Sequence, residues 1–168
     1  MRGAKRESTC FAYWSRALVI DLLKLTQMIG NLESYVEVLQ KAGSMPFKDY
    51  LRQDVLTIGG GRLYLQLAIQ CCIDIANFLI AAQGFRQPTD AADAFLVLAQ
   101  QQIISEPFQK TLQNMVGMRN ILVHEYAKVD NAKVYEVIHG RLHDFEHFAQ
   151  CVLNYARAEG ALSETDEV

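Results

Sequence analysis

Three side chains that could act together on a phosphodiester lie within residues 119–126: Arg119, Asn120 and His124, with Tyr126 two residues further on. A histidine titrates near neutral pH, so it can take a proton from an oxygen or return one. An arginine offers a fork of donors to phosphate oxygens, and an asparagine can hold an oxygen or orient the histidine. Because RNA carries its own nucleophile, the 2′-hydroxyl, these groups are a minimal set for metal-independent cleavage that leaves a 2′,3′-cyclic phosphate.

Two residues of this stretch also have a purely structural interpretation. A histidine near a helix C-terminus can satisfy free carbonyl groups and interact favourably with the helix dipole, and this would explain His124 without catalysis. Tyr126 could be an aromatic residue of the core or of an interface. Both interpretations stay open on the residues alone.

The helix that must position these groups is predicted from an apolar series that ends in a charge. Leu112, Met115 and Val116 share one helical face, and Arg119 is the next member of the series. Asn120 and His124, four residues apart, share a face of the helix. Arg119 and His124 lie about 140° apart around it, so they converge only if the helix ends near Val123 or if the arginine reaches round. We therefore place this stretch at a helix C-terminus, with His124 and Tyr126 at the exit.

A second apolar helix is predicted from Arg62 to Gln83, with one stripe of polar side chains. Its members are Arg62, Gln66, Gln70, Asp74 and Asn77. For Arg62 and Gln66 we expect a solvated face. Asp74 is surrounded in sequence by residues that favour burial, and a buried carboxylate needs a partner, for which Arg119 is the candidate. That pair could fix the arginine in a catalytic cleft or be a structural ion pair.

The spacing Arg119-x4-His124-x-Tyr126 resembles the R-x4-H-x-Y signature of the HepT-like toxins, which belong to the HEPN superfamily of all-helical ribonucleases. The flanking sequence and the helix at 62–83 also resemble the family, over roughly residues 19–158. The resemblance implies an endoribonuclease toxin of a type VII toxin–antitoxin system, with Arg119, Asn120 and His124 as catalytic residues and Asp74 in support. It implies a homodimer in which motif residues of both chains face one cleft, and no cofactor. It also implies an MNT-type nucleotidyltransferase antitoxin that transfers AMP onto Tyr126.

Composition is that of one globular domain. The chain has 168 residues, 51% of them hydrophobic and 21% charged, with a net charge of −3 that argues against a broad basic surface for nucleic acid. The four cysteines form no CxxC pair and no disulfide framework, which favours a reducing cytoplasm. No apolar run was expected to reach the length of a membrane span, so no membrane partner is predicted. We expect an extension at 1–17, the helical domain at 18–158 and a polar, acidic tail at 159–168.

Periodicity and caps predict an all-α bundle with a long antiparallel helix pair. The expected helices cover 17–41, 47–56, 62–83, 91–101, a motif helix that begins near Ser105, and one last helix at 131–157. Gly59, Gly60 and Gly61 predict a kink or break, because each glycine costs roughly 1 kcal/mol in a helix interior relative to alanine. A phosphate-cradling loop is the alternative for these glycines, although the Walker lysine and hydroxyl residue are absent.

Two other functions remain open from the sequence. His139, His143 and His147 are four residues apart on the last predicted helix, a spacing at which paired histidines can bind zinc. No carboxylate or cysteine stands at a recognised metal spacing with them, so an exposed row is the default interpretation. The second alternative is a catalytically silent HEPN-type subunit that docks a nucleotidyltransferase or a nucleotide.

Overall fold

The computed structural model describes residues 20–53, 55–124 and 129–165, and every regular element in these ranges is a helix. The elements are α1 (Leu22–Gly43), α2 (Phe47–Tyr50), α3 (Val55–Gln83), α4 (Ala91–Gln100), α5 (Glu106–His124), α6 (Asn131–Gly140) and α7 (His143–Thr165). The predicted all-α fold is confirmed.

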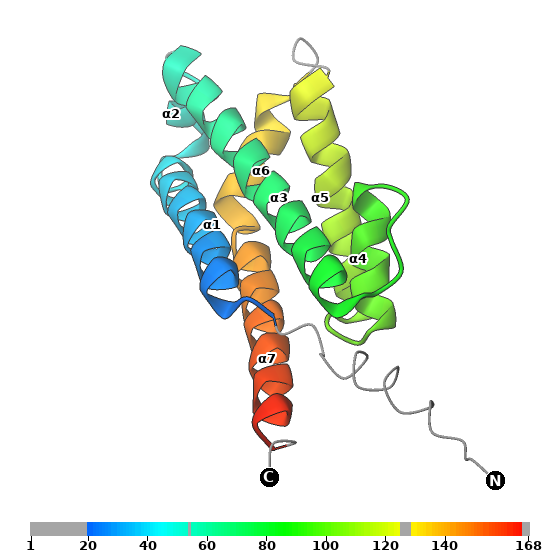
Figure 1. The fold of residues 1–168 in the computed structure, drawn as a ribbon. Coiled ribbons are helices and arrows are strands. Elements are labelled where there is room, and N and C mark those ends of the chain that lie inside the picture. Colours follow the sequence, from blue (N-terminus) through cyan, green and yellow to red (C-terminus); the bar gives the residue numbers. More distant parts are fainter. Residues whose placement is uncertain (1–19, 54, 125–128, 166–168) are drawn as a thin grey trace, which may run out of the picture.

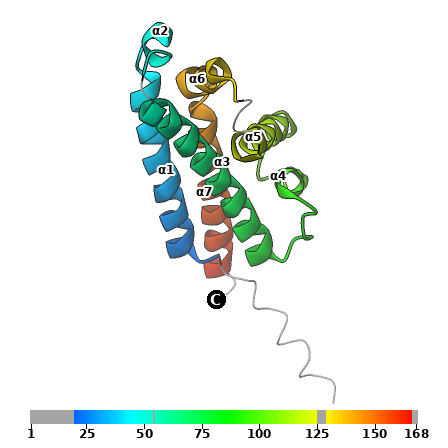
Figure 2. The ribbon, with the colours of Figure 1, turned by 90° about the horizontal axis from the view of Figure 1, so that it is seen from above.

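The long antiparallel pair is α1 and α3, which lie side by side along the bundle (Figure 1). α1 starts where Asp21 accepts a hydrogen bond from the Lys24 amide at 2.9 Å, the usual role of an N-cap aspartate. Its buried stripe faces α3 and α7 and consists of Leu25, Ile29, Leu32, Val36 and Leu39. Seen from above, α4 and α5 form a second group beside α3, α7 lies behind α3, and α6 lies next to α2 (Figure 2).

The end of α1 approaches α6 so closely that only a glycine fits. A Cβ added at Gly43 would lie 2.7 Å from the carbonyl oxygen of Ile138. Backbone cannot move aside as a flexible side chain can, so Gly43 fixes how near the two helices come. Gly43 is the last residue of α1, two residues beyond the predicted end at 41.

The predicted break at Gly59–Gly61 is wrong, because α3 runs through all three glycines. Tertiary packing outweighs the helix propensity here. Gly61 is buried, and a Cβ there would lie 3.0 Å from the Tyr50 hydroxyl and 3.4 Å from Cδ1 of Ile138. Neighbours from α2 and α6 thus enclose Gly61, whereas a Cβ added at Gly59 or Gly60 would have no neighbour within 4 Å.

α3 is more apolar than the sequence prediction allowed. Its segment Leu56–Gln83 is long and apolar enough to cross a membrane by length and composition, so the expectation that no run reaches that length was wrong. About half of the apolar window, 56%, is buried inside the bundle, where α3 packs on α1, α4 and α5. The hydropathy of α3 therefore matches its place at the centre of the fold.

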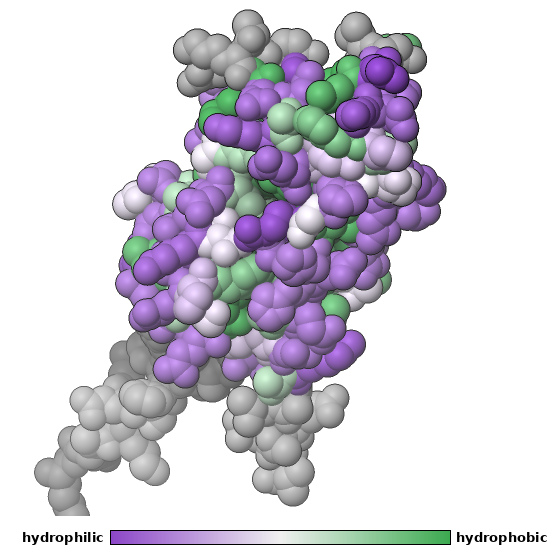
Figure 3. Space-filling model, turned by 180° about the vertical axis from the view of Figure 1, so that it is seen from behind, coloured by the Kyte–Doolittle hydropathy of each residue, from purple (hydrophilic) through white to green (hydrophobic). Residues whose placement is uncertain are grey.

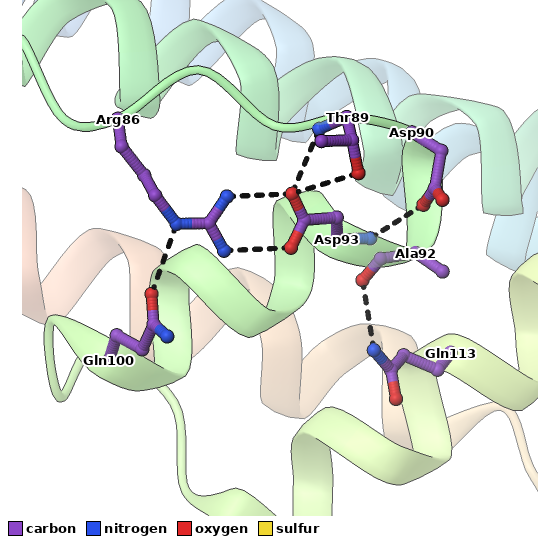
Figure 4. Close-up of polar contacts among 7 residues, drawn as sticks. All are labelled: Arg86, Thr89, Asp90, Ala92, Asp93, Gln100 and Gln113. Carbon is purple, nitrogen blue, oxygen red and sulfur yellow. Dashed lines mark hydrogen bonds and ion pairs between the residues drawn. The ribbon is translucent and has the colours of Figure 1, made fainter.

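An ion-pair network holds the loop before α4 against that helix (Figure 4). The guanidinium of Arg86 donates to both carboxylate oxygens of Asp93 at 2.7 Å, and the amide of Thr89 donates to Asp93 at 2.8 Å. Asp90 caps α4 by accepting from the Asp93 amide at 2.8 Å. Gly84 ends α3 with a φ of 66°, a left-handed conformation that glycine adopts without strain.

The predicted last helix is two helices. α6 ends at Gly140, and α7 begins at His143 and continues through Thr165, beyond the predicted end at Arg157. The apolar residues on either side of the junction include Ile138, Leu142 and Phe145, all buried. Because these spacings suit a continuous helix as well, the hydrophobic pattern could not reveal the break.

Candidate functional site

The candidate catalytic residues lie at the C-terminal end of α5. The helix starts at Glu106, just after Ser105, whose hydroxyl accepts from the Phe108 amide at 3.4 Å, so the predicted start near Ser105 is confirmed. Leu112, Val116 and Leu122 are buried and fix the rotation of α5 about its axis. His124 is the last residue of the helix, so its predicted place at the helix end is confirmed.

The structure brings Arg119 and Asn120 together. Arg119 is half-buried, and its Nη1 donates to Oδ1 of Asn120 at 3.2 Å. The Nε of Arg119 is buried and has no hydrogen-bond partner in the described part of the chain. A buried donor without an acceptor is costly, roughly 1–3 kcal/mol, unless a ligand or a second chain supplies one. Arg119 is therefore held by Asn120 while its Nε remains able to donate a further hydrogen bond.

Arg119 and His124 do not meet within one chain. Because α5 is helical through His124, the two side chains leave it about 140° apart, and Arg119 faces the bundle while His124 is exposed. The side chain of His124 makes no hydrogen bond to any residue of the described ranges. Tyr126, the predicted modification site, lies in residues 125–128, outside the described residues.

The prediction that Asp74 is buried and pairs with Arg119 is wrong. Asp74 is exposed, and its Oδ1 accepts from Nε2 of Gln70 one helical turn away at 2.8 Å. The reason is that α3 leaves one face uncovered, and Asp74 lies on it together with exposed Asn77. The carboxylate can therefore remain solvated and needs no cationic partner.

Arg62 has a structural role that the sequence did not indicate. It is half-buried rather than solvated, and its Nε and Nη2 donate to Oδ1 of Asn131 at 2.9 and 2.7 Å. Nη2 also donates to the carbonyl oxygen of Val129 at 3.3 Å. Arg62 thus ties α3 to the start of α6. The partners are 69 residues apart, so no local spacing could have revealed the contact.

The three histidines of the predicted row have separate environments. Nδ1 of His139 lies 2.9 Å from the Gly43 carbonyl oxygen, whereas His147 packs edge-on against Phe108 with ring centroids 4.5 Å apart. His143 lies beyond the α6–α7 junction, with Nε2 3.3 Å from Oδ1 of Asp144. The break between α6 and α7 is the physical reason why the row is not continuous.

A bound metal ion or a reactive thiolate would be another source of chemistry. Among the described residues, no three histidine, cysteine, aspartate or glutamate side chains group so as to hold a metal ion. Burial, with a smaller contribution from the charge of Asp74, raises the pKa of the Cys71 thiol to about 11. Burial also raises the pKa of Cys72. Both thiols are protonated at neutral pH and are poor nucleophiles.

An all-helical bundle with an arginine and a histidine at the end of one helix defines the class of this protein. Residues 27–152 match the family model described as "Ribonuclease HepT-like", and the chain belongs to that family. The prediction that this protein is a HepT-like toxin ribonuclease is thereby confirmed.

Two curated relatives and one solved structure are similar over most of the chain. The mRNA nuclease HepT of Shewanella oneidensis is 36% identical over 127 residues, which are 74% of this chain and 92% of the relative. The tRNA nuclease HepT of Aphanizomenon flos-aquae is 28% identical over 129 residues, 77% of this chain and 85% of the relative. The tri-AMPylated Shewanella oneidensis HEPN toxin in complex with MNT antitoxin has a TM-score of 0.69 and 30% identity, and the match covers 77% of this chain and 96% of that one.

Proposed function

We propose that this toxin ribonuclease cleaves RNA without a metal ion and that Arg119, Asn120 and His124 carry out the reaction. The observation that supports this most directly is the state of Arg119, which is fixed by Asn120 and retains a buried, unpartnered Nε. A guanidinium held in this way can bind the phosphate as its charge develops, with no reorganisation at the moment of reaction.

In the proposed reaction, His124 takes the proton from the 2′-hydroxyl of the ribose. The 2′-oxygen attacks the adjacent phosphorus, the bond from phosphorus to the 5′-oxygen breaks, and that oxygen leaves with a proton from water or a protonated histidine. The products are a 2′,3′-cyclic phosphate and a 5′-hydroxyl. Arg119 stabilises the charge on the non-bridging oxygens, and Asn120 fixes the guanidinium and can hold one of these oxygens.

The cleft is proposed to need two chains. A single chain directs Arg119 and His124 to different sides of α5, so a second copy is the simplest source of the missing group. Apolar side chains on the uncovered part of α3 support such a contact, since Leu56 is 86% exposed and Leu63 50%. Ile121, on α5, is 45% exposed. A C2 homodimer would cover these residues and bring both motif helices to one cleft.

The proposed partner is an MNT-type nucleotidyltransferase antitoxin, the kind of protein found in complex with the Shewanella oneidensis HEPN toxin. Tyr126 is the proposed acceptor of AMP. Each transferred AMP adds a bulky group and about one negative charge two residues beyond His124, which opposes RNA phosphate. The cytoplasm is the proposed location of the toxin.

The test is cleavage of RNA by the purified chain in the presence of EDTA. We expect wild type to cut RNA and to leave 2′,3′-cyclic phosphate ends, and His124→Ala to be inactive with an unchanged circular dichroism spectrum. Tyr135→Phe removes a hydroxyl that donates to the Met45 carbonyl oxygen at 2.6 Å and has no role in the proposed reaction, so it serves as a control. RNA binding without cleavage by wild type would contradict the proposal and favour the silent binding subunit.

A further inference from the structure

A cleft at the junction of α6 and α7 has no role in the proposed reaction. It has a volume of about 210 Å³, and helices α3, α5, α6 and α7 all contribute to its lining. It adjoins a wider groove of about 600 Å³ between α5 and α6, since Asn114, Met118 and Val137 line both. That groove reaches Ile121 and Leu122, next to the candidate catalytic end of α5. Figure 3 shows the α6–α7 face of the molecule, where hydrophobic patches lie in hollows between polar side chains.

Several polar groups in the cleft are free to bind a ligand. Arg141 uses Nε to donate to Oδ2 of Asp144 at 2.9 Å, and its two terminal nitrogens make no hydrogen bond to described residues. The side chains of Thr111 and Asn114 are likewise without a hydrogen bond in the described ranges. Asp144 is buried, so the pair fixes the guanidinium while 55% of the Arg141 side chain stays accessible.

The chemistry of the cleft suits a planar base better than a phosphate. Met115 and Met118 form part of an apolar wall, and thioethers make favourable contacts with aromatic rings. The carboxylate of Asp144 beside Arg141 would repel an anion, but an acceptor next to a donor complements the edge of a base. The volume corresponds to about seven water molecules, which is room for one ring system and less than a drug-sized ligand needs.

We propose that this cleft receives one unpaired purine of the RNA substrate and that Arg141 and Asn114 read its edge. The proposal rests on the proposed ribonuclease function. The free nitrogens of Arg141 match O6 and N7 of guanine, and the Asn114 amide can contact N6 and N7 of adenine. Asn114 lies ten residues before His124 on α5, about 15 Å along the helix axis. The base bound in this cleft is therefore not the base next to the scissile phosphate but one further along the RNA.

Binding of short single-stranded RNA to a His124→Ala chain tests the proposal without cleavage. Each purine of the RNA is replaced in turn by an abasic nucleotide. At one position we expect this replacement to weaken binding on the order of tenfold. Adding Arg141→Gln should remove most of that tenfold difference, whereas adding Arg157→Gln, on exposed α7 surface outside both clefts, should preserve it. Asn114→Ala provides a second variant if Arg141→Gln does not fold, because Asn114 is an exposed helix residue.

The outcomes separate this inference from the proposed function. If no position is sensitive, or if the Arg141→Gln, Asn114→Ala and Arg157→Gln chains show the same sensitivity, the base cleft is wrong even where wild type cuts RNA. If one position is sensitive and depends on Arg141 but wild type does not cut RNA, the proposed reaction fails while the base cleft stands. Absence of RNA binding overturns both.

Discussion

Arg119 and His124 lie on the same helix, five residues apart, yet the first is half-buried against the bundle and the second is exposed. The helix sets them about 140° apart and about 7.5 Å apart along its axis. One copy of the chain therefore presents the arginine proposed to bind phosphate and the histidine proposed to take the proton in different directions. A second copy, related by a twofold axis, could place the His124 of one chain near the Arg119 of the other.

The close approach of α1 and α6 predicts a large difference between two glycines of the same helix. Gly43→Ala should destabilise the fold by about 1–3 kcal/mol, because the new methyl group meets the Ile138 carbonyl oxygen. A Cβ added at Gly30 has no neighbouring atom within 4 Å, so Gly30→Ala should stabilise α1 by up to about 1 kcal/mol. Urea denaturation of both variants measures this. Equal stability of the two would mean that α1 and α6 are not in contact at Gly43.

The Arg86–Asp93 pair predicts how stability depends on pH. Hydrogen bonds from Arg86 hold the pKa of Asp93 well below its ordinary value. A group whose pKa is lower in the folded state stabilises the fold above its unfolded pKa, and that stability is lost as pH falls. We expect wild-type Tm to drop as pH is lowered from about 5 to about 2, and Asp93→Asn to have a lower Tm at neutral pH with a shallower fall in this window.

The matched control for this experiment is Asp49→Asn. Asp49 is exposed and its carboxylate has no ion pair within the described ranges, so its removal should preserve the wild-type slope. If Asp93→Asn and Asp49→Asn have the same pH dependence, the pair shown in Figure 4 does not contribute to folding.

Tyr126 is predicted to be the residue through which the nucleotidyltransferase silences the toxin. Tyr126→Phe should keep most ribonuclease activity and escape neutralisation by the cognate antitoxin, because the acceptor hydroxyl is gone. After co-expression, mass spectrometry should find adenylyl groups on Tyr126 and not on buried Tyr135 or on Tyr155. Neutralisation of Tyr126→Phe as complete as that of wild type would show that the antitoxin acts by occlusion instead.

The helices and the placement of Arg119 could be predicted from the sequence because both depend on local periodicity. Arg119 follows an apolar series on one helical face, and the structure finds it half-buried there. The burial of Asp74 was predicted wrongly because it was inferred from local sequence alone. Its sequence neighbours are buried, but α3 has an uncovered face, and which face stays uncovered depends on the arrangement of all the other helices.

The remaining differences come from long-range contacts. Gly59–Gly61 stay helical because Tyr50 and Ile138 enclose Gly61, and neither contact is visible in the local sequence. The bond from Arg62 to Asn131 joins residues 69 positions apart. From the sequence, Arg119 and His124 were predicted to converge only if the helix ended near Val123 or if the arginine reached round. The structure shows that α5 stays helical through His124, so the two side chains diverge.

The most direct test of a cleft completed by two chains is to mix two inactive variants. Arg119→Ala and His124→Ala are purified separately, unfolded together and refolded so that the chains reassociate at random. About half of the dimers formed at random contain one chain of each variant, and in such a mixed dimer one of the two Arg119–His124 pairings between chains is intact. We therefore expect recovery of about a quarter of wild-type RNA cleavage. Each variant refolded alone should remain inactive. If the mixture is as inactive as the separate variants while light scattering shows mixed dimers, Arg119 and His124 of different chains do not form the active site, and the account is contradicted.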